Sequence, residues 1–203
     1  MENGDQNTRP SSPPTYWLTR FVILRLLGAL YAVAFLVAIN QILPLIGSQG
    51  LLPVGPYLEQ LSAMLGSKGA ALLRLPSLFW LGHSDAALLT GAWAGPLLSL
   101  VVVAGFANVP LLAALWFLYL SYVHVGQEWY GYGWEIQLTE TGFLAIFLCP
   151  LLDARPFPRH PPPMPILVLF RWLEFRIMLR AGAGGEVNGP GIPLLTAEYL
   201  DAP

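Results

Sequence analysis

Long apolar stretches alternate with polar segments along this chain, and the apolar stretches have the lengths of membrane-spanning helices. Residues 21–39 contain a single charged side chain, Arg25. Residues 86–123 carry no formal charge, and Pro110 near their middle favours a break between two helices. Because about twenty apolar residues cross the hydrocarbon core of a bilayer, these stretches predict one span followed by an antiparallel pair of spans.

Two shorter apolar segments follow. The first, 138–152, has Glu140 near its start and Pro150 near its end, so it is either a brief span or a re-entrant segment, and we favour a span. The second, 164–180, contains Arg171, Glu174 and Arg176 in addition to Arg180 at its end, and a lone helix in lipid tolerates such charges poorly. The pattern predicts an all-α fold, a polytopic membrane helix bundle with about five transmembrane helices, at residues 21–43, 86–107, 110–125, 138–152 and 164–180.

The segments outside these spans complete the predicted domain organisation. Residues 1–16 are polar and rich in proline and predict a disordered tail, and residues 181–203 predict a flexible C-terminal tail. The multi-pass membrane domain then covers residues 17–180. Residues 40–85 combine Gly, Pro and Ser with short amphipathic pieces, which predicts an amphipathic connecting loop on one membrane face.

The distribution of Lys and Arg favours a cytoplasmic N-terminus. With that orientation the cytoplasmic side holds four cations, Arg9, Arg20, Arg155 and Arg159. The other side holds three, Lys68, Arg74 and Arg180. The positive-inside rule then places an aromatic loop at 124–137 on the non-cytoplasmic face.

Composition excludes several classes of protein. Charged residues make up 11 % of the 203 residues, less than half of the usual quarter, while 55 % are hydrophobic, so the chain is not a soluble monomer and its expected partner is a lipid bilayer. A formal net charge of −2 gives no positive field for nucleic acid, so no nucleic-acid partner is expected. Cys149 is the single cysteine, which excludes an internal disulfide and a cysteine-rich metal site.

Five charged residues within the predicted spans need partners, because ionisable groups are costly in hydrocarbon: Arg25, Glu140, Arg171, Glu174 and Arg176. In one interpretation Arg171 pairs with Glu174 on the same helix, and the other cations reach the headgroups from helix ends. In the other, these residues form a buried polar cluster that receives a proton, a carboxylate or a lipid headgroup.

His124 and Glu128 are four residues apart, a spacing that fits acid–base chemistry or half of a metal site. Two ligands do not make a metal site, and His83 and His160 have no ligand spacing around them. The sequence also contains no HExxH, G-x-S-x-G or Walker motif. We therefore expect no metal, no cofactor and no enzymatic activity.

Aromatic and acidic side chains are concentrated after the third predicted span: Glu128, Trp129, Tyr130, Tyr132, Trp134 and Glu135. Trp and Tyr at the end of a span commonly anchor at the level of the lipid headgroups. Exposed Trp and Tyr also carry much of the energy of protein interfaces, so the same residues are a candidate binding site for a client protein. Both roles can hold together.

Several strings, in order along the chain, resemble the lipase maturation factor family. They are YWLTR at 16–20, LIGSQGLLPV at 45–54, LPSLFW at 75–80, LYLS at 118–121, ETGFLAIFL at 140–148 and RWL at 171–173. The likeness extends from about Tyr16 to Leu179, which is nearly the whole chain outside its tails.

The resemblance implies a multi-pass membrane protein of the endoplasmic reticulum that assists the folding and assembly of secreted lipases and is not itself an enzyme. It also implies five spans, a cytosolic N-terminus and a lumenal loop at 126–137 that begins the region for client handling. The family is distantly similar to the membrane domain of vitamin-K-dependent carboxylases. That similarity keeps an alternative open, a membrane enzyme acting on lipid or on a protein side chain, with a polar centre of Arg25, Glu140, Arg171 and His124.

Members of the family continue after the fifth helix into a β-rich extramembrane domain, which these 203 residues do not contain. We therefore expect either a fragment of a longer protein or a minimal membrane module that handles its client through its loops. The content of Ala, Leu, Gly and Pro is typical of a bacterial coding sequence, in which case the membrane would be the plasma membrane. The sequence leaves the client and the oligomeric state open.

Overall fold

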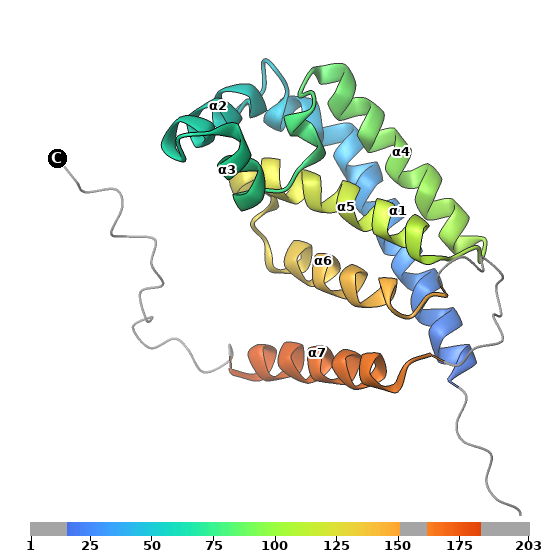
Figure 1. Cartoon of the computed structure of the whole chain (residues 1–203). Helices are drawn as coiled ribbons and strands as arrows, with labels where there is room; N and C mark the ends of the chain where they lie inside the picture. The colour runs from blue at the N-terminus through green and yellow to red at the C-terminus, as the bar shows by residue number, and fades with distance from the viewer. Residues whose placement is uncertain (1–15, 151–161, 184–203) are drawn as a thin grey trace, which may run out of the picture. The chain divides into compact units, whose positions relative to one another are not determined.

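The computed structural model describes residues 16–150 and 162–183, and all its regular elements in those ranges are helices (Figure 1). In chain order they are α1 (Trp17–Ile46), α2 (Val54–Met64), α3 (Lys68–Arg74), η1 (Leu78–Trp80), α4 (Asp85–Val103), α5 (Val109–Val125), η2 (Gln127–Tyr130), α6 (Gly133–Ile146) and α7 (Met164–Ala183). The predicted all-α fold is therefore confirmed. The chain divides into two compact units, 1–163 with α1 to α6 and 164–203 with α7.

The first unit is built on an antiparallel pair of long helices, α1 and α4, which lie side by side in Figure 1. Glycine allows the two backbones to approach. A Cβ atom on Gly28 of α1 would lie 3.0 Å from Val102 of α4, and one on Gly95 of α4 would lie 2.1 Å from the ring of Phe35. Small residues at such crossings are typical of helices that pack within membranes.

Aromatic rings join α5 to this pair. Tyr31 and Phe35 of α1 meet Tyr119 of α5 edge to face, with ring centroids 5.3 Å and 5.6 Å apart. Tyr122 of α5 packs 4.9 Å from Phe79 of η1 and donates a hydrogen bond of 2.5 Å to the Leu88 carbonyl of α4. All five rings are at most 3 % exposed. We call these five residues, Tyr31, Phe35, Phe79, Tyr119 and Tyr122, the aromatic core.

Helix α6 packs against α5 through its polar backbone as well as its side chains. Trp116 of α5 donates from Nε1 to the Thr139 carbonyl at 2.9 Å, and its ring lies 5.3 Å from that of Phe143. Tyr31 of α1 donates to the Leu138 carbonyl at 3.3 Å. These two bonds give the polar atoms of Trp116 and Tyr31 partners on α6. Among the described residues, every buried polar side-chain atom has a hydrogen-bond partner.

Large apolar side chains remain exposed along both long helices. On α1 and α4 those at least 50 % exposed are Leu18, Leu26, Leu30, Val33, Leu36, Trp93, Leu97 and Leu100. By length and composition two described helices could cross a membrane, Leu18–Ile46 and Asp85–Val103, and Val109–Val125 is apolar but shorter. The first two predicted spans therefore have helices long enough to carry them, while the count of five spans stays a prediction.

Several helix ends differ from the predicted span ends. Helix α1 extends beyond the predicted span 21–43 at both ends, so the connecting loop predicted at 40–85 begins only after Ile46. Helix α4 ends at Val103, four residues before the predicted end of the second span, because Gly105 adopts a φ of 106° that glycine tolerates best. Asn108 then caps α5, its side chain accepting from the Leu111 amide at 2.9 Å. The hairpin between the second and third predicted spans thus turns at Gly105 to Asn108.

Helix α6 differs more from its prediction. It begins at Gly133, five residues before the predicted span 138–152, and ends at Ile146. Fourteen residues of α-helix are about 21 Å long, which is shorter than the roughly 30 Å hydrocarbon core of a bilayer. Residues 133–137 of the predicted aromatic loop, 124–137, consequently belong to the start of α6. The predicted tails 1–16 and 181–203 lie almost wholly outside the described residues, and so does most of the linker 155–163.

The connecting segment 47–84 and the 3₁₀ turn η2 lie at the same end of the first unit. Gln127 donates from Nε2 to the Leu52 carbonyl at 3.0 Å, and His124 Nδ1 lies 2.7 Å from the Pro76 carbonyl oxygen. We call this end the loop end. Two loops predicted on one membrane face require such an arrangement, although the side of the membrane stays a prediction.

Candidate functional site

The turn that carries the predicted client-binding residues has a fixed backbone. Gln127 has a φ of 52°, an uncommon conformation for a residue with a side chain, and its side-chain Nε2 donates to the Leu52 carbonyl of the connecting segment at 3.0 Å. The ring of Tyr130 lies over Gly126, where a Cβ atom would be 2.3 Å from its Cδ2. The turn is therefore held by one long-range hydrogen bond and by one buried ring.

Glu135 fixes the other side of this turn. It stands in the first turn of α6, is 3 % exposed, and accepts a short hydrogen bond from the hydroxyl of Tyr119, a ring of the aromatic core. Burial raises the pKa of Glu135 from 4.5 to about 7, against the lowering effect of the hydrogen bond from Tyr119. Burial also raises the pKa of the Tyr130 phenol. Both polar groups are placed inside the unit, close to the aromatic core.

Exposed aromatic side chains surround these buried anchors. Tyr132 is 61 % exposed, Trp134 51 % and Trp129 37 %. We call these three residues the aromatic surface. Of the six residues predicted to bind a client, Glu128 and the aromatic surface are exposed, whereas Tyr130 and Glu135 are buried and support them. Tyr130 and Glu135 therefore do not lie on the exposed surface that the other four residues form, and client binding by any of the six stays a prediction.

The predicted intramembrane polar cluster divides between the two units. Arg25 of α1 donates to the Ala104 carbonyl at 3.3 Å and stacks over the Phe21 ring, with 3.5 Å from its Cζ to the ring centroid. It thereby binds the carbonyl at the end of α4. Glu140 lies half-buried on α6. The other three, Arg171, Glu174 and Arg176, lie on α7 in the second unit, so a cluster of all five stays a prediction.

His124 contacts backbone and not an acidic side chain. Because the Pro76 carbonyl oxygen can only accept, the Nδ1 atom at 2.7 Å carries the proton and donates it. Arg25 lies at the opposite end of α5 from His124, since Ala104 precedes α5 by a few residues. The length of α5, about 25 Å, separates the two side chains. Within the described residues, no three His, Cys, Asp or Glu side chains lie close enough together to hold a metal ion.

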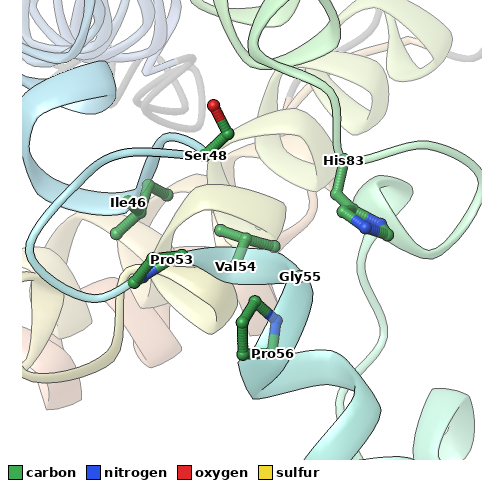
Figure 2. Close-up of a pocket in the computed structure, with 7 residues that line it drawn as sticks. All are labelled: Ile46, Ser48, Pro53, Val54, Gly55, Pro56 and His83. Atoms are coloured by element: carbon green, nitrogen blue, oxygen red, sulfur yellow. The ribbon is translucent and has the colours of Figure 1, made fainter.

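A small pocket lies at the loop end, and the sequence did not predict it. It has a volume of about 240 Å³, and Figure 2 shows His83 beside the start of α2, with Ile46 and Pro53 on the other side. His83 Nε2 would lie 3.3 Å from a Cβ atom on Gly55. A bulkier residue at Gly55 would therefore meet His83 at the edge of this pocket.

A pair of hydrogen bonds next to the pocket joins the ends of the two long helices. The amide and the hydroxyl of Ser48, just after α1, both donate to the carboxylate of Asp85, the first residue of α4, at 2.7 Å each. Asp85 also follows Ser84, whose hydroxyl accepts from the Ala87 amide and caps α4. In the sequence, Ser84 followed by Asp85 predicts the start of a helix. It does not predict the hydrogen bonds between Asp85 and Ser48.

The chain matches the family model described as the lipase maturation factor transmembrane domain over residues 18–184. It is 50 % identical to Lipase maturation factor 1 of Bos taurus over 175 residues, which cover 83 % of this chain and 31 % of that protein. Over 205 residues it is 42 % identical to Lipase maturation factor 1 of Homo sapiens, covering 89 % of this chain and 36 % of the relative.

A more distant relative is Lipase maturation factor 2 of Gallus gallus, which is 32 % identical over 176 residues, covering 80 % of this chain and 24 % of the relative. The chain thus spans about a third or less of the length of these relatives. No solved structure matches it. The match of the family model to nearly the whole described chain shows that it belongs to the lipase maturation factor family.

Proposed function

We propose that this chain is the membrane-embedded part of a maturation factor that assists the folding and assembly of secreted lipases, and that the aromatic surface binds the client. The names of its relatives, Lipase maturation factor 1 and 2, support the lipase as the client class. The observation that carries the site is the exposure of Trp129, Tyr132 and Trp134 on a turn with a fixed backbone.

Rigid aromatic side chains are well suited to bind a folding protein. Trp and Tyr bury a large area on contact and lose little rotamer entropy, so a few of them supply most of the affinity of an interface. The bonds of Gln127 and Glu135 hold the backbone between Gly126 and Glu135 before any client arrives. Such preorganisation lowers the entropic cost of binding.

The location that we propose is the endoplasmic reticulum membrane, with the loop end in the lumen, where secreted lipases fold. The weak excess of Lys and Arg on the other side of the predicted spans supports that orientation. The activity that we propose is binding without catalysis. It needs no side chain to act as an acid, base or nucleophile.

The membrane-enzyme alternative required its polar groups to meet in one membrane-embedded cavity. Arg25 binds the Ala104 carbonyl and His124 the Pro76 carbonyl, at opposite ends of α5. Because these carbonyls lie near opposite ends of a helix that is about 25 Å long, the two side chains are not placed to act on one substrate atom. The geometry therefore favours the maturation factor over the enzyme.

The test is capture of a secreted lipase by the tagged chain from detergent extracts of cells that express both, together with the amount of active lipase secreted. Replacing Trp129 and Trp134 by Ala is expected to reduce capture at least about tenfold, because truncated Trp hot spots commonly cost 2 kcal/mol or more. Trp93→Ala is the matched control, since Trp93 is 57 % exposed on α4, within a predicted span.

Two outcomes would contradict the proposal. Unchanged capture by the Trp129/Trp134 double variant would show that the client binds elsewhere on the chain. Absence of lipase from the capture by the unaltered chain, with the lipase present in the extract, would show that the client class is wrong.

A further inference from the structure

The connecting segment between α1 and α4 carries apolar side chains that are exposed in the part of the chain that the structure describes. Between Ser48 and Asp85 seven large apolar residues are more than 36 % exposed: Leu51, Met64, Leu65, Leu72, Leu73, Leu78 and Leu81. Leu81 is 90 % exposed and Leu73 87 %, against 71 % for Leu18 of α1 and 64 % for Leu97 of α4. Leaving so many large apolar side chains in water is unfavourable, and such sets mark interaction surfaces.

The two ends of this segment lie together at the end of the predicted spans. Helix α1 ends at Ile46 and α4 begins at Asp85, and the Ser48–Asp85 hydrogen bonds join the two ends directly. Both helices are long and apolar enough to cross a membrane. A segment that leaves one span and returns to its neighbour at the same end lies at the level of the membrane surface.

The charges of the segment suit the same location. Its three charged residues are Glu59, Lys68 and Arg74. Lys68 and Arg74 are the first and last residues of α3, the helix that also presents Leu72 and Leu73, and all four side chains are exposed. Leucines flanked by Lys and Arg are typical of helices that lie in the interface, with the apolar side chains in the acyl region and the cations at the phosphates.

We propose that residues 64–81, which include α3 and η1, insert Leu73, Leu81 and their apolar neighbours into the outer acyl region of the lipid leaflet at the loop end, with Lys68 and Arg74 at the phosphates. This segment is then a third membrane contact, beside the exposed faces of α1 and α4. The proposal needs a membrane and no client, so it stands or fails independently of lipase binding.

A depth measurement in lipid nanodiscs that hold one copy of the chain tests this. In a Cys149→Ala background, which removes the single native cysteine, single cysteines replace Leu73, Leu81, Gln60 or Leu97 and carry an environment-sensitive nitrobenzoxadiazole label. Gln60 is the water control, as an exposed polar residue of α2, and Leu97 is the lipid control, at 64 % exposure on α4.

Discs of phosphatidylcholine with brominated acyl chains are expected to quench the labels at 73 and 81 about twofold, as at 97, because interfacial side chains reach roughly 5–10 Å into the leaflet. The label at 60 is expected to keep its intensity. Quenching at 73 and 81 no greater than at 60 would overturn the proposal. Blue-shifted emission without quenching would also overturn it, because protein and not lipid would then cover these residues.

The cations are tested separately. Adding anionic phosphatidylglycerol to the discs is expected to increase quenching of the label at 73, because the lipid then attracts Lys68 and Arg74. The Lys68→Gln/Arg74→Gln variant is expected to lose that increase. An unchanged response in this variant would show that the two cations do not meet the headgroups.

Discussion

Replacing Glu135 by Gln is expected to stabilise the protein at neutral and alkaline pH, although it removes a buried group with a hydrogen bond. The Glu135 carboxyl is 3 % exposed and its pKa is raised to about 7, so folding disfavours its ionised form. A Gln side chain keeps an oxygen that can accept from the Tyr119 hydroxyl but carries no charge. The substitution therefore removes the free-energy cost of burying an ionised carboxylate and retains the hydrogen bond from the Tyr119 hydroxyl.

The sign and size follow from proton linkage. Below the ordinary pKa of 4.5 the carboxyl is protonated in both states and costs nothing, and the folded chain loses stability as the pH rises from 4.5 to about 7. The difference between the two pKa values corresponds to roughly 3 kcal/mol as an upper limit. Relaxation of the folded chain around the buried charge lowers this cost, so we expect a gain of about 1–2 kcal/mol.

The assay is thermal unfolding in mild detergent, followed by intrinsic tryptophan fluorescence at pH 4 and pH 8. Glu135→Gln is expected to unfold a few degrees higher than the unaltered chain at pH 8, and at the same temperature at pH 4. Glu128→Gln is the matched control, because Glu128 is exposed on η2, and should change neither value. A lower unfolding temperature for Glu135→Gln at pH 8 would refute the reasoning, since the ionised carboxylate would then be the stabilising form.

Two further predictions concern the α1–α4 pair and use the same unfolding assay. Gly95→Ala is expected to lower the free energy of unfolding by about 1–3 kcal/mol, because the added methyl group would lie 2.1 Å from the Phe35 ring. Gly69→Ala is the control, since open space surrounds Gly69. Equal effects of the two substitutions would contradict close packing of α1 against α4. Asp85→Asn is expected to lower the unfolding temperature by weakening the two bonds from Ser48, and Asp85→Glu, with a longer side chain, should not restore it; an unchanged temperature for Asp85→Asn would show that the joint contributes nothing.

The sequence predicted the helical class and the long helices well, because apolar runs of such length have few other solutions. Its limits lay at helix ends. The predicted start of the fourth span at 138 follows the hydropathy, which falls at the charged Glu135. Helix α6 nevertheless begins at Gly133, since Glu135 in its first turn is buried and accepts a hydrogen bond from the Tyr119 hydroxyl. From sequence alone, a charged residue such as Glu135 predicts a loop or an exposed position. Its buried position depends on Tyr119, which lies on another helix, α5.

The candidate site was predicted in part for a similar reason. Hydropathy and residue type located the aromatic turn, but they do not distinguish Trp129, which is exposed, from Tyr130, which covers Gly126. The distinction depends on the backbone of Gln127, whose φ of 52° no pattern of neighbouring residues announces. The joint of Ser48 with Asp85 likewise links residues 37 apart in the chain.

These buried contacts connect the aromatic surface to the centre of the bundle. Glu135 and Trp134 are neighbours in the first turn of α6, so the bond that draws Glu135 inward to Tyr119 also directs Trp134 outward. Tyr119 is itself packed against Tyr31 and Phe35 of α1. A rearrangement of α1 against α5 would therefore move the anchor of the aromatic surface, which gives the membrane helices a direct physical route to the face that we propose binds the client.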